Sequence, residues 1–396
     1  MKCYLLLLST ITTSAIVTAA EPGRLILEVT EPIGVHRDGA PVHVELALPK
    51  PVPISTAFRL TFGGKPITAQ FRPNGDEEKT ANWWLDFVSP SSPFEKRQYV
   101  VDYGKEVKPG PERKRGHRLI RREDAFVVSN APYIDWTIPH DFSGFLRSVD
   151  FEPFEHLKPD SMGLSVRDRD GRLHQLGGEG TTARVVRAGP MTVALRFENT
   201  ETSEALRGVD WSADLIFPGP VSWVELHLKI DDPQNQVVEA TLQLKLNLDE
   251  PDRAKRTLVE LGAARTIYRS LIGEGEIELR ADANAIPAWQ VFRGTNQQLQ
   301  PFVVGSKDAS LAEGWAHVMD RKRCLAIAFD NFGRKGEERI KIRANGVLTA
   351  SKRFADPAQK QWRSWLHFVQ FPPQQSATSD PRMMQNPLTV RQLKDE

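Results

Sequence analysis

Residues 188–232 alternate apolar and polar side chains in three successive runs, and this alternation constrains the fold more than any other feature of the chain. The apolar members are Val193, Leu195 and Phe197; Trp211, Ala213, Leu215 and Phe217; and Val224, Leu226, Leu228 and Ile230. A period of two predicts strands with one core face and one wet face. Pro218-Gly219-Pro220 predicts a turn between the last two runs, because proline fixes φ and glycine accepts conformations closed to other residues. The stretch therefore predicts an antiparallel hairpin within a large β-sandwich.

Short alternating runs also fill residues 24–104, where prolines and glycines separate them. They are Leu25–Val29, Val42–Leu48, Phe58–Phe62, Trp83–Phe87 and Tyr99–Tyr103. So many strands in about 80 residues leave no room for crossover helices and predict a small barrel or sandwich.

After residue 123 the β pattern continues almost to the end of the chain. Thr241–Leu248 alternates throughout, and Ser165–His174 predicts a hairpin. Thr257–Leu271 fits either a short helix or two strands, and two strands are favoured. No repeat period recurs, which disfavours a propeller or solenoid. The predicted fold class is all-β: a small N-terminal β-barrel over residues 21–118, then a large antiparallel sandwich over residues 119–372. Residues 373–396 lose the pattern and are expected to be a loose tail.

The first 20 residues have a basic start, a short apolar centre and small residues before Glu21, which predicts a secretory signal peptide. The protein is therefore expected to be secreted or periplasmic. No later segment has the roughly 20 apolar residues of a spanning helix, so no membrane span is expected. Cys3 leaves with the signal peptide, and Cys324 alone cannot form an internal disulfide.

Positive and negative charges nearly balance, with 52 Lys and Arg against 51 Asp and Glu, and no nucleic-acid partner is expected. Positive charge is concentrated between Lys105 and Arg122, in a stretch rich in proline and glycine without apolar periodicity. This stretch is interpreted as the domain boundary. It is either a solvated linker or a basic lip that attracts an anionic polymer.

The chain resembles the exo-rhamnogalacturonan lyase-like family. The N-terminal segments that carry the resemblance are Glu31–Val35, Pro41–Pro49 and Trp83–Phe87; the central ones are Arg187–Pro190, Phe217–Ile230, Gly314–Asp320 and Ala326–Phe332. The resemblance implies an N-terminal RIFT-type barrel joined to a galactose-mutarotase-like sandwich. It also implies a polysaccharide partner, with β-elimination as the reaction of active members.

One departure from the family pattern concerns the C-terminal side of the sandwich. Family enzymes carry a long α/α-toroid there, whereas this sequence ends at Glu396. The expectation is a protein that binds acidic, uronate-containing cell-wall polysaccharide and has weak or no lyase activity by itself.

Sequence motifs for metalloproteases, phosphate loops, hydrolase elbows and dinucleotide sites are absent, so neither a metal nor a cofactor is expected. A uronate lyase needs a cation to neutralise the carboxylate and a base to take the adjacent proton. Tyr133, His140 and Arg147 supply these residue types within one short stretch, and Asp141 could orient His140. The alternative is that these side chains pack or face solvent at a strand turn.

Sugar-binding positions are expected among the aromatic side chains, because these can stack on pyranose rings. The candidates are Trp83, Trp84, Trp136 and Trp315, with His317 beside the last of them. Adjacent residues in one strand face opposite sides, so either Trp83 or Trp84 belongs to the core.

Two other functions remain open at this point. A glycoside hydrolase would need two carboxylates across a groove, and Asp141, Glu152 and Glu155 are possible members. A non-catalytic structural or carbohydrate-binding protein would need no acid or base at all.

Overall fold

The structure, a computed structural model, describes residues 23–130, 132–199, 206–248, 257–273, 275–295, 298–308, 311–358, 360–370 and 379–393. The predicted signal peptide lies outside these residues. Within them the chain forms antiparallel strands in five sheets and one short helix. The all-β fold class is therefore confirmed. No described helix is both long and apolar enough to pass through a lipid bilayer.

The N-terminal lobe consists of two small sheets around one core. Its strands are β1 (Gly23–Thr30), β2 (Arg37–Pro53), β3 (Phe58–Phe62), β4 (Lys65–Ile67), β5 (Ala69–Pro73), β6 (Lys79–Ser91), β7 (Lys96–Tyr103) and β30 (Thr389–Leu393). One sheet has the order β30-β1-β7-β3-β4 and the other the order β2-β6-β5. Leu27, Leu60, Leu85 and Val101 are fully buried between them. The RIFT-type topology stays a prediction.

The larger lobe is the antiparallel β-sandwich expected from the sequence. Its eight-stranded sheet contains β14 (Leu173–Gln175), β13 (Gly163–Asp168), β19 (Val237–Lys245), β28 (Val347–Arg353), β27 (Glu338–Arg343), β22 (Glu276–Ala281), β23 (Trp289–Thr295) and β24 (Gln298–Val304), in this order. The nine-stranded sheet contains β15 (Thr181–Arg187), β16 (Thr192–Asn199), β17 (Asp210–Pro218), β18 (Trp223–Asp231), β29 (Lys360–Gln370), β26 (Arg323–Phe329), β25 (Ala312–Met319), β20 (Leu258–Ala263) and β21 (Thr266–Leu271).

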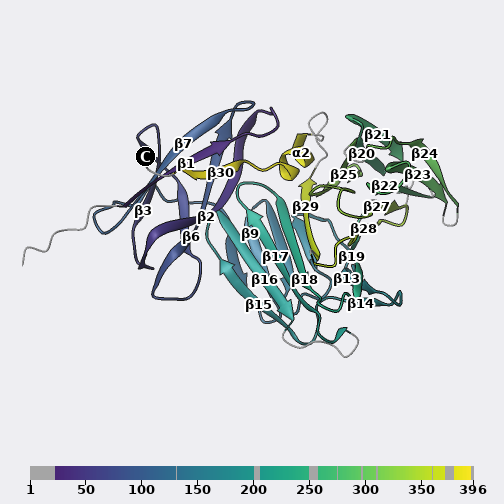
Figure 1. The fold of residues 1–396 in the computed structure, drawn as a ribbon, viewed down its shortest axis with the longest axis horizontal. Helices are drawn as coiled ribbons and strands as arrows, with labels where there is room; N and C mark the ends of the chain where they lie inside the picture. The colour runs from purple at the N-terminus through teal and green to yellow at the C-terminus, as the bar shows by residue number, and fades with distance from the viewer. Residues whose placement is uncertain are drawn as a thin grey trace, which may run out of the picture.

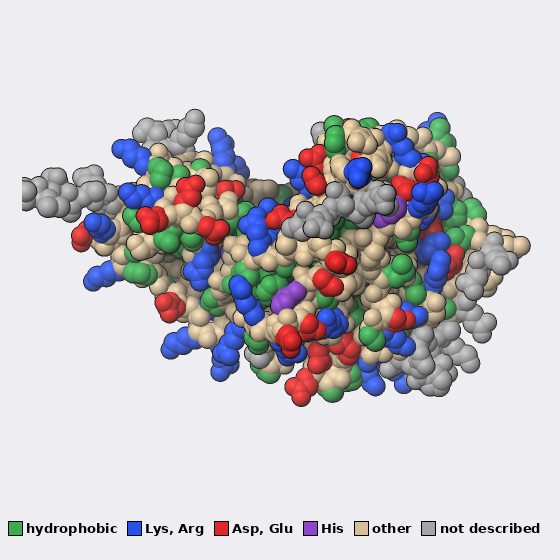
Figure 2. Space-filling model, turned by 90° about the horizontal axis from the view of Figure 1, so that it is seen from below, with side chains coloured by type: hydrophobic (Ala, Val, Ile, Leu, Met, Phe, Trp, Pro, Cys, Tyr) green, Lys and Arg blue, Asp and Glu red, His purple; other side chains and the backbone are tan. Residues whose placement is uncertain are grey.

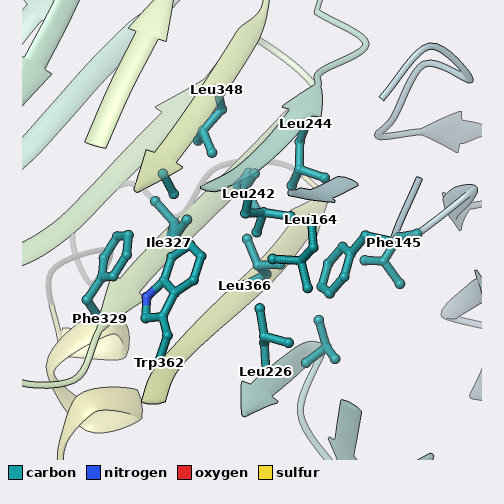
Figure 3. Close-up of a cluster of buried hydrophobic side chains, with 14 of the residues drawn as sticks. Phe145, Leu164, Leu226, Leu242, Leu244, Ile327, Phe329, Leu348, Trp362 and Leu366 are labelled. Atoms are coloured by element: carbon teal, nitrogen blue, oxygen red, sulfur yellow. The ribbon is translucent and has the colours of Figure 1, made fainter. Parts of the chain in front are cut away.

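A third sheet adds to the same core and lies beside β17 and β18 (Figure 1). It contains β12 (Phe154–Glu155), β11 (Ser148–Phe151), β10 (Ile134–Pro139), β9 (Ala125–Asn130) and β8 (Arg118–Arg121). Figure 3 shows the centre of the core, where Leu226, Ile327 and Leu366 of the nine-stranded sheet face Leu242, Leu244 and Leu348 of the eight-stranded sheet.

The predicted hairpin over residues 217–230 is confirmed. β17 pairs with β18 in the register Leu215↔Leu226 and Ala213↔Leu228, so the apolar members of both strands enter the core together. The polar members of β18 consequently share the outer face of the nine-stranded sheet. The predicted hairpin β13–β14 is also present, and the two strands favoured within Thr257–Leu271 are β20 and β21, which pair with each other.

The expectation of a loose C-terminal tail is wrong for residues 379–393. Ser379–Gln385 forms the helix α2, and β30 then pairs with β1 in the N-terminal lobe. The C-terminal chain therefore crosses from the sandwich to the first lobe, with α2 between them (Figure 1). The sequence concealed this because a short strand at a sheet edge buries few residues: Leu388 joins the N-terminal core while most of β30 stays exposed.

The basic stretch from Lys105 to Arg122 is not solvated throughout. His117 is buried and its ring packs against Trp136 at a centroid distance of 5.6 Å. Residues from Arg118 onward form β8, which pairs with β9. The C-terminal part of this stretch is therefore fixed against the sandwich, while the domain limits at residues 118 and 119 stay a prediction.

Candidate functional site

A cavity of about 1150 Å³ lies where the N-terminal lobe, the basic stretch, the sandwich and α2 meet. The N-terminal lobe contributes the beginning of β2, the sandwich contributes β18 and β29, and Met383 and Met384 come from α2. This volume lies just above the range of typical small-molecule sites. The cavity is therefore the strongest candidate for a functional site among the described residues.

Positive side chains dominate the ionised groups in the cavity wall. Four arginines line it, Arg37, Arg113, Arg115 and Arg118, against the two carboxylates Asp38 and Glu225. Burial lowers the pKa of Arg113, although an arginine stays protonated at neutral pH. Figure 2 shows charges of both signs interspersed over one face of the molecule. The wall of the cavity differs, because its arginines outnumber its carboxylates.

The outer face of the nine-stranded sheet carries two rows of side chains that run across the strands. The first row is Trp223, His367, Ala326, His317 and Glu260, and the second is Glu225, Trp365, Ala328 and Trp315. Directly paired residues of neighbouring strands point to the same side of a sheet. The β18 and β29 ends of both rows line the cavity.

Glu225 is buried in the cavity wall and is surrounded by cations and imidazoles. Its Oε1 lies 3.3 Å from Nε2 of His43, and its Oε2 lies 3.4 Å from Nε2 of His227 and 3.1 Å from Nη2 of Arg363. Burial acts to raise the pKa of Glu225, but His43, His227 and Arg363 together outweigh burial and hold the pKa well below its ordinary value. The Glu225–His43 contact also joins the sandwich to the N-terminal lobe.

A Ser–His contact lies beside this carboxylate. Nε2 of His367 is 3.1 Å from Oγ of Ser222, which donates a hydrogen bond to the carbonyl oxygen of Phe368 at 2.7 Å. Desolvation in the wall, with a smaller contribution from His317, lowers the pKa of His367 to about 4. His367 is therefore neutral at pH 7. Tyr133, which is 66% exposed, lines the same cavity.

The predicted catalytic group of Tyr133, His140, Asp141 and Arg147 is not brought together. Tyr133 precedes β10 and His140 follows it, and seven residues of extended chain span roughly 20 Å. The ring of His140 packs on Phe126 at a centroid distance of 4.4 Å.

The other two members of that group have local structural contacts. Arg147 pairs with Asp124 at 2.6 Å on the exposed surface. Asp141 accepts hydrogen bonds from the backbone N and Oγ of Ser143. The aromatic density of this stretch reflects packing, because Phe142 and Phe145 are fully buried. Of the four residues, Tyr133 alone lines the cavity.

Most of the predicted stacking tryptophans are not accessible. Trp83 and Trp136 lie in the two cores, 2% and 0% exposed. Trp84 is half-buried beneath the guanidinium of Arg187, 4.2 Å from its ring centroid, and does not line the cavity. Trp315 and His317 do lie on the outer face of the nine-stranded sheet, but both are buried there.

No carboxylate pair faces across the cavity among its described lining residues. Asp38 is fully exposed, and Glu225 is engaged by three partners. Glu155 is half-buried away from the cavity, and its Oε1 accepts hydrogen bonds from the backbone N–H groups of Val149 and Leu157 at 2.8 Å each. Asp141, Glu152 and Glu155 do not line the cavity, so they form no carboxylate pair across it. The described residues also contain no group of three or more His, Cys, Asp or Glu side chains that could hold a metal ion.

The sequence analysis missed His43, Trp223, Glu225, Trp365 and His367 as members of the site. Three strands of two lobes contribute them, and no linear motif links them. A usable signal existed in β18, where the wet face carries Trp223, Glu225 and His227 in succession.

No family model and no curated protein matches the sequence. Solved structures match the fold. A glycosyl hydrolase family 38 protein from Enterococcus faecalis is similar over 94% of this chain and 48% of its own, with 11% identity and a TM-score of 0.54. An α-mannosidase from Enterococcus faecalis V583 is similar over 94% of this chain and 46% of its own, with 11% identity and a TM-score of 0.51.

A galactose mutarotase-like protein from Lactobacillus casei also matches, over 64% of this chain and all of its own, with 9% identity and a TM-score of 0.34. At such identities these likenesses describe the fold alone. The chain spans about half the length of the two Enterococcus faecalis proteins.

Proposed function

We propose that the cavity between the lobes binds an acidic carbohydrate, a uronate-containing polysaccharide met outside the cytoplasm. The observation that carries this proposal is the composition of the wall, which four arginines line together with the aromatic rings of Tyr133, Trp223 and Trp365, the ring of Tyr133 being the exposed one. Guanidinium groups bind carboxylates through two parallel hydrogen bonds, and aromatic rings pack on the apolar faces of sugars. A uronate presents both features in one ring.

The individual side chains suit this ligand in different ways. Arg115 and Arg118 are exposed at the wall, whereas Arg37 is already paired with Glu31 at 2.9 Å. We therefore assign carboxylate binding to Arg115 and Arg118. Tyr133 is accessible for stacking, and Ser222 and His43 offer hydrogen-bonding groups for sugar hydroxyls.

The comparisons support a carbohydrate ligand in general terms. The two similar Enterococcus faecalis proteins are described as a glycosyl hydrolase and an α-mannosidase. The expected signal peptide and the resemblance to rhamnogalacturonan lyases point to a cell-wall polysaccharide. The uronate preference rests on the arginines of the wall.

Calorimetric titration of the mature chain with oligogalacturonates tests the proposal. The double variant Arg115→Gln/Arg118→Gln should weaken binding at least about tenfold, because each change removes a charge-assisted hydrogen bond. Lys108→Gln/Lys114→Gln is the matched control, since both lysines are exposed in the same stretch and neither lines the cavity. Equal losses in both double variants would indicate unspecific charge attraction and would refute the assignment.

A lyase reaction is the second candidate, and the coincidence of Tyr133, His367 and arginines in one cavity favours it. An arginine would neutralise the uronate carboxylate, and neutral His367, or Tyr133 as its phenolate, would take the proton from the adjacent carbon. The C–O bond to the next sugar then breaks, its oxygen gains a proton, and an unsaturated uronate remains. Ultraviolet absorbance of that product should vanish in Tyr133→Phe or His367→Gln. Absorbance that persists in both variants would exclude these bases.

A further inference from the structure

A small apolar patch lies on the outer face of the nine-stranded sheet, separate from the main core. It contains Trp223, Trp315, Ala326, Ala328 and Trp365, and Met384 of α2 packs on it. Trp315 and Trp365 are at most 1% exposed. The patch is thus a group of three indoles on a sheet face whose neighbouring positions are otherwise polar.

The register gives this patch a definite shape. Trp365, Ala328 and Trp315 are paired in sequence across β29, β26 and β25, so an alanine separates the two indoles. Ala326 lies on the same face two residues away along β26. Two methyl groups between larger rings leave a hollow on the sheet surface, and Met384, 1% exposed, fills it.

The helix that carries Met384 is held mainly by polar contacts. Arg382 makes a two-pronged ion pair with Glu313 at 2.8 and 2.9 Å, and Nε2 of Gln385 donates to the carbonyl oxygens of Glu313 and Phe329. From the N-terminal lobe, Arg37 donates to the carbonyl oxygen of Asn386 at 2.6 Å. These polar contacts hold α2 in addition to the burial of Met384 in the patch.

The patch continues the floor of the cavity beneath α2. Trp223 and Trp365 belong to both, and Met383 and Met384 form part of the cavity wall. Trp315 lies immediately beyond, beside His317, whose Nδ1 is 3.1 Å from Oε2 of buried Glu260. A ligand that displaced α2 would therefore uncover Trp365 and meet one further indole, Trp315, with additional polar groups, next to the cavity.

We propose that the patch is a second sugar-stacking subsite, which Met384 occupies when no long ligand is bound. This inference rests on the proposed function. Its occupant is the next pyranose ring of an acidic oligosaccharide whose first ring is held by Arg115 and Arg118. A thioether and the C–H face of a sugar both pack on aromatic rings, so one can replace the other. Pairing of β30 with β1 keeps α2 attached to the protein after it lifts.

The test compares affinities for digalacturonate and hexagalacturonate. Arg382→Ala loosens α2, and Met384→Ala empties the hollow; either should raise the hexamer-to-dimer affinity ratio about two- to tenfold. Quenching of tryptophan fluorescence by acrylamide should increase in Arg382→Ala. Arg391→Ala, an exposed change on β30, is the matched control and should leave the ratio unchanged. Met384→Ala decides the question if Arg382→Ala fails to fold.

The possible outcomes separate this inference from the proposed function. Dimer binding with an unchanged ratio in Arg382→Ala and Met384→Ala would show that the patch only packs α2, and would leave the cavity assignment intact. If the unchanged protein binds neither digalacturonate nor hexagalacturonate, the proposed function and this inference are both overturned.

Discussion

The two faces of the nine-stranded sheet use the same strands for different purposes. On the inner face of β18 and β29, Val224, Leu226, Leu366 and Phe368 are fully buried in the main core. On the outer face of the same strands, Trp223, Glu225 and His367 line the cavity. Stability and the candidate function are thus separated by a single residue step along each strand.

This difference shows what alternation in a strand can and cannot specify. The inner face needs apolar volume, which tolerates many sequences provided that size and shape are kept. The outer face needs particular groups at particular registers, since Glu225 reaches His43 of the other lobe and Arg363 of the next strand. Substitutions on the two faces should therefore affect different measurements.

The largest expected effect is on the inner face. Leu226→Ala removes a fully buried side chain from the main core and should lower the free energy of unfolding by about 3 kcal/mol. Lys229→Ala, an exposed position on the outer side of β18, should change it by less than about 0.5 kcal/mol. Denaturant titration measures both. Similar losses would mean that the two faces do not differ as described.

Glu225→Gln changes the residue beside Leu226 in β18. It should lower the free energy of unfolding by about 2 kcal/mol at pH 7, because it removes the negative charge that His43, His227 and Arg363 contact. The pKa of Glu225 is lowered in the folded protein, so its contribution is complete above the ordinary pKa of about 4.3 and is lost as pH falls through the lowered value.

The stability difference between Glu225→Gln and the unchanged protein should therefore shrink as pH is lowered below about 4.3. Unfolding curves between neutral and acidic pH measure this difference. A gap that widens on acidification would contradict the assignment of Glu225 as a stabilised carboxylate.

Two tryptophan substitutions on neighbouring strands sharpen the comparison at a smaller scale. Trp362 lies on the inner face and stacks on Phe329 with the ring centroids 5.4 Å apart. Trp362→Phe should lower the free energy of unfolding by about 1 kcal/mol without changing the affinity for oligogalacturonate. Trp223→Phe lies on the outer face and should weaken oligogalacturonate binding about threefold with little loss of stability. If Trp362→Phe weakened binding and Trp223→Phe lowered stability, the roles assigned to the two faces would be wrong.

The smallest effects are expected at the far end of β10. His140→Ala and Arg147→Ala should leave oligogalacturonate affinity unchanged, because neither residue lines the cavity. Their partners Phe126 and Asp124 belong to the local packing and surface of that end. Titration of both variants beside Tyr133→Ala, which should weaken binding, provides the measurement. A loss of affinity in His140→Ala or Arg147→Ala would instead support the catalytic group that the sequence suggested around Tyr133.

The sequence predicted the sandwich well because burial imposes a period that local reading can detect. The runs in β17, β18 and β19 have the alternation that a two-sided sheet requires, and the turn residues between β17 and β18 are decisive. β30 was not predicted because its pairing with β1 joins residues more than 350 positions apart and buries few side chains. Such long-range pairing leaves no local period.

The site was harder to predict because its members are neighbours only across strands. Trp223 and His367 are paired by register, and His43 reaches Glu225 from another lobe. Sequence proximity suggested the stretch from Tyr133 to Arg147 instead, although an extended strand separates its ends. Tyr133, which the sequence suggested as a catalytic residue, lines the cavity wall, whereas the histidine and arginines beside it come from elsewhere in the chain.

The most direct test of the central claim is a crystal structure of the mature protein with a short oligogalacturonate. The account predicts a uronate carboxylate between Arg115 and Arg118, with a sugar ring against Tyr133 or Trp223, inside the cavity between the lobes. Ligand bound at the far end of β10, near His140 and Arg147, or on a surface remote from the cavity, would contradict it.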